Sequence, residues 1–197
     1  DRNGIIGESS QIRNCLQTVA QTARTDANVL ITGETGTGKE LFARAIHRNS
    51  ARSDQPFVVV DCAALLETLV ESQLFGHEKG AFTGADHATV GLIAQANGGT
   101  LFLDEVGELS AQLQKAFLRV LQERQFRRVG GNHEIASDFR LVAATNKSLE
   151  DLVTNNLFRE DLLSRLKSVS IDLPPLRNRK EDIKDLVSYL TTGIFSR

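Results

Sequence analysis

A glycine-rich segment near the N-terminus has the composition of a phosphate-binding loop. It follows the apolar run 29–32, precedes a helical pattern that carries Leu41 and Phe42, and reads Gly33-Glu34-Thr35-Gly36-Thr37-Gly38-Lys39. Glycines allow successive backbone N–H groups to turn toward phosphate oxygens, and the following helix N-terminus adds partial positive charge. Lys39 would then reach the β- and γ-phosphates. The segment predicts nucleotide binding; a plain glycine-rich turn is the alternative.

The residue after the lysine departs from the general phosphate-loop pattern. A Ser or Thr hydroxyl usually stands there and binds magnesium, whereas this chain has Glu40. The substitution predicts that magnesium is coordinated differently here, for example through water.

Two acids end the apolar run 100–103. Carboxylates are costly at the end of a buried strand unless they serve a cation or a reacting water. We predict that Asp104 holds Mg²⁺ and that Glu105 polarises the attacking water, so that the chain hydrolyses a nucleotide. The alternative is a pair of acids capping a helix N-terminus.

An amide follows another predicted strand, at 140–144. Asn146 would lie at the carboxyl edge of the sheet, where it could hydrogen-bond a γ-phosphate oxygen and the lytic water. An Asx turn that opens a helix over 148–155 is the competing interpretation.

Two arginines stand six positions apart in the segment 158–166. On one helix they would be separated by about 240° and would not share a face. Arg159 and Arg165 are therefore either solvated surface charges or, for at least one of them, an arginine finger that reaches a neighbouring subunit.

A further segment brackets an aromatic residue with glycines, and reads Gly80-Ala81-Phe82-Thr83-Gly84-Ala85. Neither a helix nor a central strand is favoured there. The simplest prediction is a loop that presents Phe82 and Thr83 for recognition, with a phenylalanine tucked back as a local anchor as the alternative.

Short β-branched runs alternate with helical patterns, which predicts an α/β fold with a mostly parallel sheet. The predicted strands are 29–32, 57–61, 100–103, 140–144 and 169–173. The first three lack strict alternation, which predicts that they are central. Helical apolar spacing predicts helices around 12–20, around 113–121 after the N-cap Ser110, around 148–155, and around 183–190.

Composition narrows the class of protein. A net charge of −2 with 41% hydrophobic residues indicates one globular domain without the positive field that holds a polyanion. No apolar run is long enough to span a bilayer, so we expect a cytoplasmic protein without membrane contact. The two cysteines, Cys15 and Cys62, are expected to be buried thiols.

Together these motifs resemble the AAA+ domain of bacterial enhancer-binding proteins, the NtrC-type activators of sigma-54 RNA polymerase. The resemblance covers nearly the whole chain. Its segments are Walker A with its following glutamate at 33–40, Walker B at 98–105, the stretch 71–77 leading into the GAFTGA signature at 80–85, the approach to a second surface loop at 126–131, the arginine-finger segment at 158–166, and the exit toward a helical lid at 173–183.

The resemblance implies a P-loop AAA+ ATPase with ATP and Mg²⁺ as ligands. It implies a ring of six or seven copies whose GAFTGA loop grips sigma-54 RNA polymerase holoenzyme, with Arg159 and Arg165 acting in the neighbouring subunit's site. Ile5, Ile6 and Gly7 fall where the family packs the adenine.

One residue differs from the family pattern. Where the second strand commonly ends in an Asn that relays nucleotide state from the catalytic glutamate, this chain has Asp61, and a carboxylate would be repelled by Glu105. The competing function is a nucleotide-gated oligomeric interaction module with little turnover, in which Asp61 and the missing helical lid impair the site.

The resemblance also bears on domain organisation. Residues 1–197 are expected to form one AAA+ sigma-54 interaction domain with the helical lid largely absent. The sensory region, as in two-component regulators, and the region that contacts DNA are expected to lie outside this chain.

Overall fold

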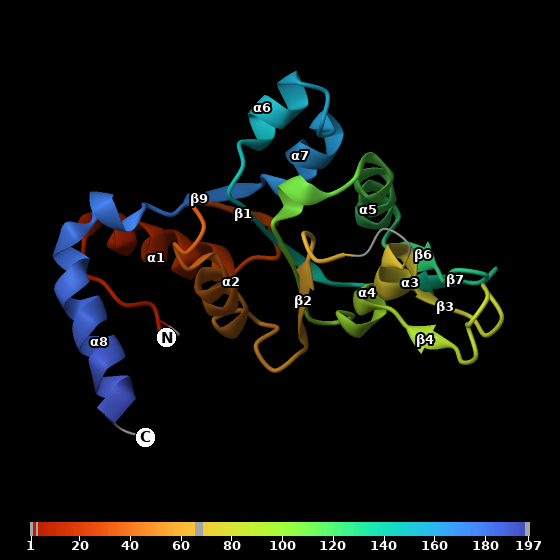
Figure 1. Ribbon diagram of the computed structural model, residues 1–197, viewed down its shortest axis with the longest axis horizontal. Helices are drawn as coiled ribbons and strands as arrows, with labels where there is room; N and C mark the ends of the chain where they lie inside the picture. The colour runs from red at the N-terminus through yellow and green to blue at the C-terminus, as the bar shows by residue number, and fades with distance from the viewer. Residues whose placement is uncertain (1, 3, 66–68, 196–197) are drawn as a thin grey trace.

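A parallel five-stranded sheet in the order β2-β5-β8-β1-β9 forms the centre of the computed structural model, which describes residues 2, 4–65 and 69–195 (Figure 1). Every pairing between neighbouring strands of this sheet is parallel. Its strands are β1 (Val29–Thr32), β2 (Phe57–Asp61), β5 (Thr100–Asp104), β8 (Arg140–Thr145) and β9 (Val169–Asp172). All five lie where the sequence predicts them, to within one residue at each end.

Helices cover both faces of the sheet. The α-helices are α1 (Ser10–Ala23), α2 (Lys39–Arg48), α3 (Val70–Phe75), α4 (Leu92–Gln95), α5 (Ala111–Glu123), α6 (Leu149–Thr154), α7 (Glu160–Leu166) and α8 (Ile183–Phe195), and short 3₁₀ turns are η1 (Val106–Glu108), η2 (Leu176–Asn178) and η3 (Lys180–Asp182). Alternate strand residues point to opposite faces. Val29 and Ile31 pack with α1 and α2, whereas Leu30 packs in the core formed with α3, α4, α5 and α7.

One strand is not where its composition predicts. The prediction that 57–61 is central is wrong, because β2 pairs only with β5 and forms an edge of the sheet. Val59 is 36% exposed, whereas all six residues of β8 are buried. An apolar run indicates that both faces of a strand are covered by other elements. It does not indicate whether the strand pairs with one neighbouring strand or with two.

The helix predictions agree with the structure at their starts. The Ser110 hydroxyl caps α5 by accepting from the Leu113 N–H at 3.4 Å, and the Ser148 hydroxyl caps α6 by accepting from the Asp151 N–H at 3.1 Å. Both cysteines are free and buried. In the described part of the chain no helix combines the length and apolar character needed to cross a bilayer.

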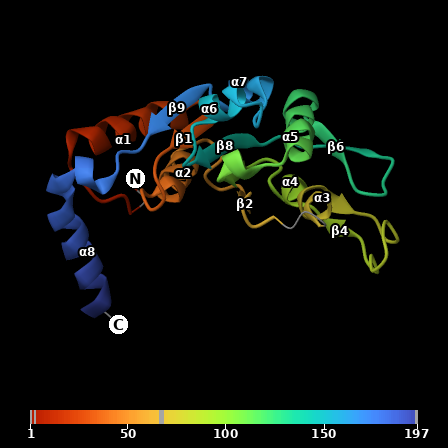
Figure 2. The ribbon, with the colours of Figure 1, turned by 45° about the horizontal axis from the view of Figure 1, so that its top comes forward.

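Helix α8 projects from one end of the molecule (Figures 1 and 2). Its predicted apolar stripe does not enter the core, since Val187 and Leu190 are 55% and 61% exposed. The opposite end carries two small antiparallel hairpins, formed by β3 (Gly76–His77) with β4 (Thr89–Val90), and by β6 (Gln125–Arg127) with β7 (Glu134–Ala136). The glycine-bracketed segment 80–85 is the connection between β3 and β4.

Candidate active site

The glycine-rich loop connects β1 to α2 at the carboxyl edge of the sheet. Gly38, at φ 95°, adopts the left-handed conformation that disfavours a side chain and directly precedes α2. The first residue of α2 is Lys39, of which 7% is exposed. Its Nζ donates to the carbonyls of Gly33 at 3.0 Å and Glu34 at 3.3 Å, so the ammonium group lies inside the curve of the loop.

The acid at the end of β5 has an unusual backbone. Glu105, at φ 51° and ψ 49°, is left-handed although it is not a glycine, a conformation that costs free energy and is concentrated at functional sites. Its carboxylate lies between two groups from other elements. Oε1 is 3.4 Å from the Lys39 Nζ, and Oε2 accepts from the Asn146 backbone N–H at 3.1 Å.

Asn146 completes the connection across the edge. Its side-chain Nδ2 donates to the Thr35 hydroxyl at 3.1 Å, so it contacts both the glycine-rich loop and Glu105. Lys39, Glu105 and Asn146 are therefore brought together as predicted. They meet because β1, β5 and β8 are adjacent and parallel, which places their carboxyl ends along one edge.

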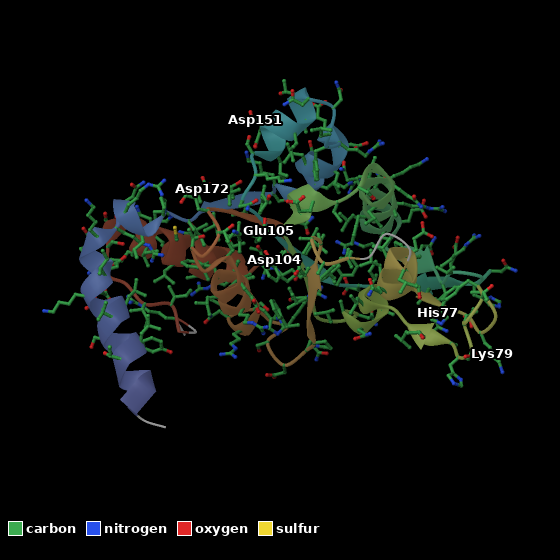
Figure 3. The ribbon with its side chains drawn as sticks, viewed as in Figure 1. His77, Lys79, Asp104, Glu105, Asp151 and Asp172 are labelled. Carbon is green, nitrogen blue, oxygen red and sulfur yellow. The ribbon has the colours of Figure 1, made fainter. Side chains whose placement is uncertain are left out.

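Asp104 lies beside this cluster (Figure 3), and within the described residues no Lys, Arg or His side chain forms an ion pair with it. Its Oδ1 accepts from the Glu105 N–H at 3.0 Å. Burial raises the pKa of Asp104 above its usual value, and the neighbouring carboxylates of Glu105 and Asp61 add to the rise while Lys39 opposes it. A partly buried carboxylate with little compensating charge is a suitable ligand for a hard divalent cation. The residues present therefore fit a magnesium-bound triphosphate.

A cavity of about 430 Å³ opens next to the loop. Its walls comprise the N-terminal segment, the loop, α2 and the segment after β9, with Gly4, Ile5, Ile6, Glu34, Thr35, Gly36, Thr37, Gly38, Leu41, Phe42, Pro175, Leu176, Arg177, Arg179 and Leu186. The predicted Ile5 and Ile6 line it. Gly7 does not, because it packs on Asp182, whose Cγ would lie 2.7 Å from a Cβ at position 7.

The buried Asp182 anchors the N-terminal segment that lines this cavity. Its carboxylate accepts from the N–H groups of Glu8 and Ser9, both at 2.8 Å, and from the Ser9 hydroxyl at 2.6 Å. Burial alone would raise the pKa of Asp182, but these hydrogen bonds and Arg179 outweigh it and lower the pKa.

Arg177 was not predicted as a site residue, although it stands at the mouth of the cavity. Its guanidinium forms two hydrogen bonds with the Glu34 carboxylate, at 2.8 and 2.6 Å. The two residues are 143 positions apart, so no local pattern could have indicated the pair.

Glu40 pairs with an arginine on the same helix. Its Oε1 accepts from Arg44 Nε at 2.9 Å and Nη2 at 2.7 Å, one turn further along the exposed side of α2. The prediction that magnesium coordination is arranged without a hydroxyl at this position stays a prediction.

Asp61 is the register partner of Asp104, yet it makes a local contact. Its Oδ1 accepts from the Ala63 N–H at 3.0 Å. The N–H of Cys62, the residue between them, donates to the Asp104 carbonyl at 3.0 Å. The Glu105 carboxylate contacts Lys39 and Asn146 instead. A direct relay from Glu105 to Asp61 is therefore not formed in this conformation.

The two arginines occupy different positions around α7. Arg159 is the N-cap residue, so the helical-wheel comparison with Arg165 does not apply to it. Its Nη2 is 2.7 Å from the Asp161 carboxylate. Arg165 lies in the last turn, and the side chains of both are exposed. In the part of the chain that the structure describes, neither guanidinium forms a hydrogen bond or ion pair with the glycine-rich loop of its own chain.

The segment 80–85 lies at the far end of the molecule from α8, and His77 and Lys79 mark its base in Figure 3. The Phe82 side chain is partly exposed and also has a local packing partner, while its role in recognition stays a prediction. The side chain is 39% exposed, and its ring packs edge-on against the His77 ring with centroids 4.9 Å apart.

Comparison with known proteins gives a consistent picture. The protein-family model described as "Sigma-54 interaction domain" matches residues 5–172 of this chain. The chain is 53% identical over 186 residues to the transcriptional regulatory protein ZraR of Klebsiella oxytoca, covering 94% of this chain and 42% of that protein. It is 56% identical over 184 residues to the Nif-specific regulatory protein of Rhodobacter capsulatus, covering 93% and 32%. The chain thus spans less than half the length of these relatives.

Solved structures agree. The crystal structure of NtrX from Brucella abortus in complex with ADP is similar with a TM-score of 0.91 and 39% identity, over 98% of this chain and 43% of that one. The P-loop NTPase domain of a sigma-54 activator from E. coli is similar with a TM-score of 0.57 and 26% identity, over 87% and 99%.

Proposed function

The chain belongs to the family of sigma-54 interaction domains, the AAA+ domains of enhancer-binding activators, and we propose that it is the ATP-hydrolysing unit of a ring that remodels sigma-54 RNA polymerase holoenzyme. The observation that carries the hydrolytic part is the position of the Glu105 carboxylate, which is held between the Lys39 ammonium and the Asn146 N–H by a left-handed backbone. A structural helix cap would not require that conformation.

Each polar group at the edge has a proposed role. Lys39 binds the terminal phosphates, and Glu105 orients the attacking water and accepts its proton on a carboxylate oxygen. The Asn146 side chain, which now donates to Thr35, is close enough to the loop to hydrogen-bond that water or a phosphate oxygen. Mg²⁺ on the triphosphate would neutralise developing negative charge, and Asp104 is the carboxylate suited to hold it.

A ring of six or seven copies is supported by the arginines. Arg159 and Arg165 are exposed and do not contact the loop of their own chain, as expected of groups that complete a neighbour's site. In this proposal one or both stabilise charge on the neighbouring subunit's phosphates.

The partner is proposed to be sigma-54 holoenzyme, bound by Phe82 and Thr83. The exposed Phe82 ring on a hairpin loop is the supporting feature. DNA contact is assigned to a region outside this chain, because its net charge of −2 gives no positive surface field.

A nucleotide-gated module with little turnover is the second candidate. It is favoured by the Asp61 carboxylate, which accepts from Ala63 rather than contacting Glu105, so that the relay is not formed. The two candidates differ in the rate of phosphate release.

The first experiment compares Glu105→Gln with Glu108→Gln. Removing the base should slow phosphate release about 100- to 10,000-fold while ATP still binds. Glu108 is three residues away and pairs with Lys147 at 2.8 Å, so its substitution controls for loss of a nearby surface carboxylate. Equal rates in E105Q and the unsubstituted chain would refute the assignment, and negligible release by the unsubstituted ring would favour the module.

The second experiment concerns the partner. Thr83→Ala should keep phosphate release and abolish open-complex formation by sigma-54 holoenzyme at a closed promoter. Thr154→Ala, which removes an exposed hydroxyl bonded to the Glu150 carbonyl, is the matched control and should leave both unchanged. Loss of both activities together in T83A would count against a dedicated coupling loop.

A further inference from the structure

His77 stands between helix α3 and the aromatic tip of the loop. Its Nδ1 is 2.6 Å from the Ser72 hydroxyl on α3, and its Nε2 is 3.4 Å from the Thr89 hydroxyl on β4. The tip of the loop also contacts this imidazole. The Phe82 ring packs edge-on against it, with an angle of 62° between the two ring planes. One side chain thus touches a helix, the opposite strand of the hairpin and the tip.

The two hydroxyls restrict the imidazole from opposite sides of the ring. A single hydrogen bond would leave the ring free to turn about that contact, whereas partners on both nitrogens fix its plane. Because the edge-on contact with Phe82 depends on the angle between the planes, fixing the imidazole also fixes the preferred orientation of Phe82.

The base of the loop is anchored and its tip is held by its own backbone. Glu78 N–H donates to the Val129 carbonyl at 3.0 Å, which ties the base to the second hairpin. Within the loop, Gly80 N–H donates to the Ala85 carbonyl at 2.9 Å. His77 is at the boundary between these two parts.

The second hairpin approaches the loop closely. Gly130 is left-handed, at φ 75°, and a Cβ there would lie 2.7 Å from that of Ala81. This contact restricts the backbone at the base and leaves the Phe82 side chain to be oriented by His77.

Helix α3 shares an apolar core with β5, the strand that ends in Asp104. Val70 and Leu74 share a core cluster with Leu101 and Leu103 of β5. A displacement at the end of β5 can therefore reach α3 through this shared core, and the imidazole from α3 through Ser72.

We propose that His77 is a positioning residue that links α3 to Phe82 and sets the orientation of the aromatic tip. The inference rests on the proposed function in one respect, that Phe82 is the part of the loop presented to a partner. The link itself is defined by contacts within this chain and is tested without a partner.

The chain contains no tryptophan and one tyrosine, so Phe82→Trp introduces a single tryptophan at the tip, which is excited selectively at wavelengths that tyrosine does not absorb. In the full F82W chain we expect fluorescence anisotropy to fall toward that of a freely rotating side chain in H77A, and to an intermediate value in S72A. The exposed His87, in the same hairpin connection, supplies the control, and H87A should leave the anisotropy unchanged. Thermal unfolding of each variant shows whether the fold is retained.

A double-mutant cycle separates a link through His77 from two independent effects. If Ser72 acts through the imidazole, S72A has no further effect in the H77A background. H77F, which keeps a ring but loses both hydroxyl contacts, should give an anisotropy between the values of S72A and H77A. Anisotropy unchanged in H77A, or an S72A effect of equal size in both backgrounds, would overturn the proposal.

With Phe82 intact, H77F and S72A should retain phosphate release and reduce open-complex formation by sigma-54 holoenzyme. Altered anisotropy with unaltered open-complex formation would leave the positioning role standing and contradict the role of the loop in the proposed function. Unaltered anisotropy would overturn the positioning role whatever the polymerase assay shows.

Discussion

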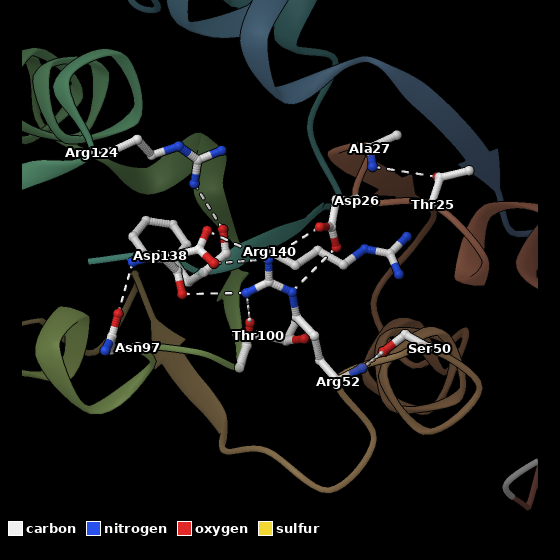
Figure 4. Close-up of polar contacts among 12 residues, drawn as sticks. Thr25, Asp26, Ala27, Ser50, Arg52, Asn97, Thr100, Arg124, Asp138 and Arg140 are labelled. Carbon is white, nitrogen blue, oxygen red and sulfur yellow. Dashed lines mark hydrogen bonds and ion pairs between the residues drawn. The ribbon is translucent and has the colours of Figure 1, made fainter. Parts of the chain in front are cut away.

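Charged side chains lie both at the carboxyl ends and at the amino ends of the strands in the central sheet, here called its carboxyl edge and its amino edge. The two groups differ in how their charges are paired. At the carboxyl edge, no cationic group of the described residues donates a hydrogen bond to Asp104. Lys39 Nζ lies 3.4 Å from Glu105 Oε1 and also donates to two backbone carbonyls. At the amino edge, arginines are surrounded by acceptors (Figure 4). The same sheet thus leaves carboxylate charge available at one end and pairs arginine side chains at the other, although the buried Arg140 Nε has no hydrogen-bond partner among the described residues.

The amino edge is a network of arginine contacts. Arg52 Nη2 is 3.1 Å from the Asp26 carboxylate and 3.2 Å from that of Asp138. Arg140, the first residue of β8, is 1% exposed, and its Nη2 donates to the Thr22 carbonyl at 2.7 Å near the end of α1. These contacts connect α1, the segment after α2 and the start of β8.

The pKa shifts separate the acids of the two edges, although burial lowers the pKa of Arg140 at the amino edge. Hydrogen bonds from Arg52 lower the pKa of Asp26, whereas burial raises the pKa of Asp104. Charge that is already paired contributes to folding, while charge that is poorly compensated is held ready for a ligand. Four substitutions test this difference.

The largest effect is expected at the carboxyl edge. Lys39→Ala should reduce ATP hydrolysis about 100-fold or more, because the phosphates lose their only cation from the loop. Its thermal stability should change little, since the ammonium contacts carbonyls that water can then reach. Lys115→Ala, an exposed lysine on α5, is the control for phosphate-release measurements. Unchanged hydrolysis in K39A would remove the functional half of the comparison.

The next effect is on folding at the amino edge. Arg140→Leu should lower the free energy of unfolding by about 1–3 kcal/mol, because the carbonyl of Thr22 loses its buried donor. Denaturant unfolding measures this loss, and nucleotide affinity should stay the same. Arg119→Leu removes an exposed arginine with an i,i+4 partner and should cost much less. A fall in nucleotide affinity in R140L would show that the two edges are coupled.

A smaller effect is expected for Arg52→Gln, about 1 kcal/mol or less because both acids it pairs with are exposed. The pKa of Asp26 is lowered in the folded chain, so its stabilisation is present above the unfolded value and is lost as the pH falls through the folded pKa. The stability difference between R52Q and the unsubstituted chain should therefore be full at pH 7 and shrink below about pH 4. A difference independent of pH would point to lost packing rather than to the ion pair.

The smallest effect on stability is expected for Asp104→Asn, which should stabilise the folded chain rather than destabilise it. The pKa of Asp104 is raised on folding, so the contribution of this group is most favourable below the unfolded pKa and declines as the pH rises through the folded one. Asp104→Asn should therefore raise the melting temperature of the nucleotide-free chain at pH 7, with no gain near pH 4 or below, even though hydrolysis falls. A lower melting temperature at pH 7 would show that Asp104 is a structural residue.

Much of this molecule follows from local sequence pattern. The strands, the helix starts at Ser110 and Ser148 and the glycine-rich loop before Lys39 could be predicted, because periodicity, hydroxyl caps and glycine spacing are properties of neighbouring residues. The predicted meeting of Lys39, Glu105 and Asn146 needed one assumption more, that parallel strands end at a common edge.

Other features were decided only by the tertiary structure. The edge position of β2, the left-handed Glu105, the burial of Arg140 and the pairing of Arg177 with Glu34 join segments that are remote in the sequence. A residue's own neighbours determine which face of an element is apolar. Strand order, the conformation forced on a residue between packed elements, and the partner of a charge depend on which elements come to lie beside it, and that is settled by the packing of the whole core.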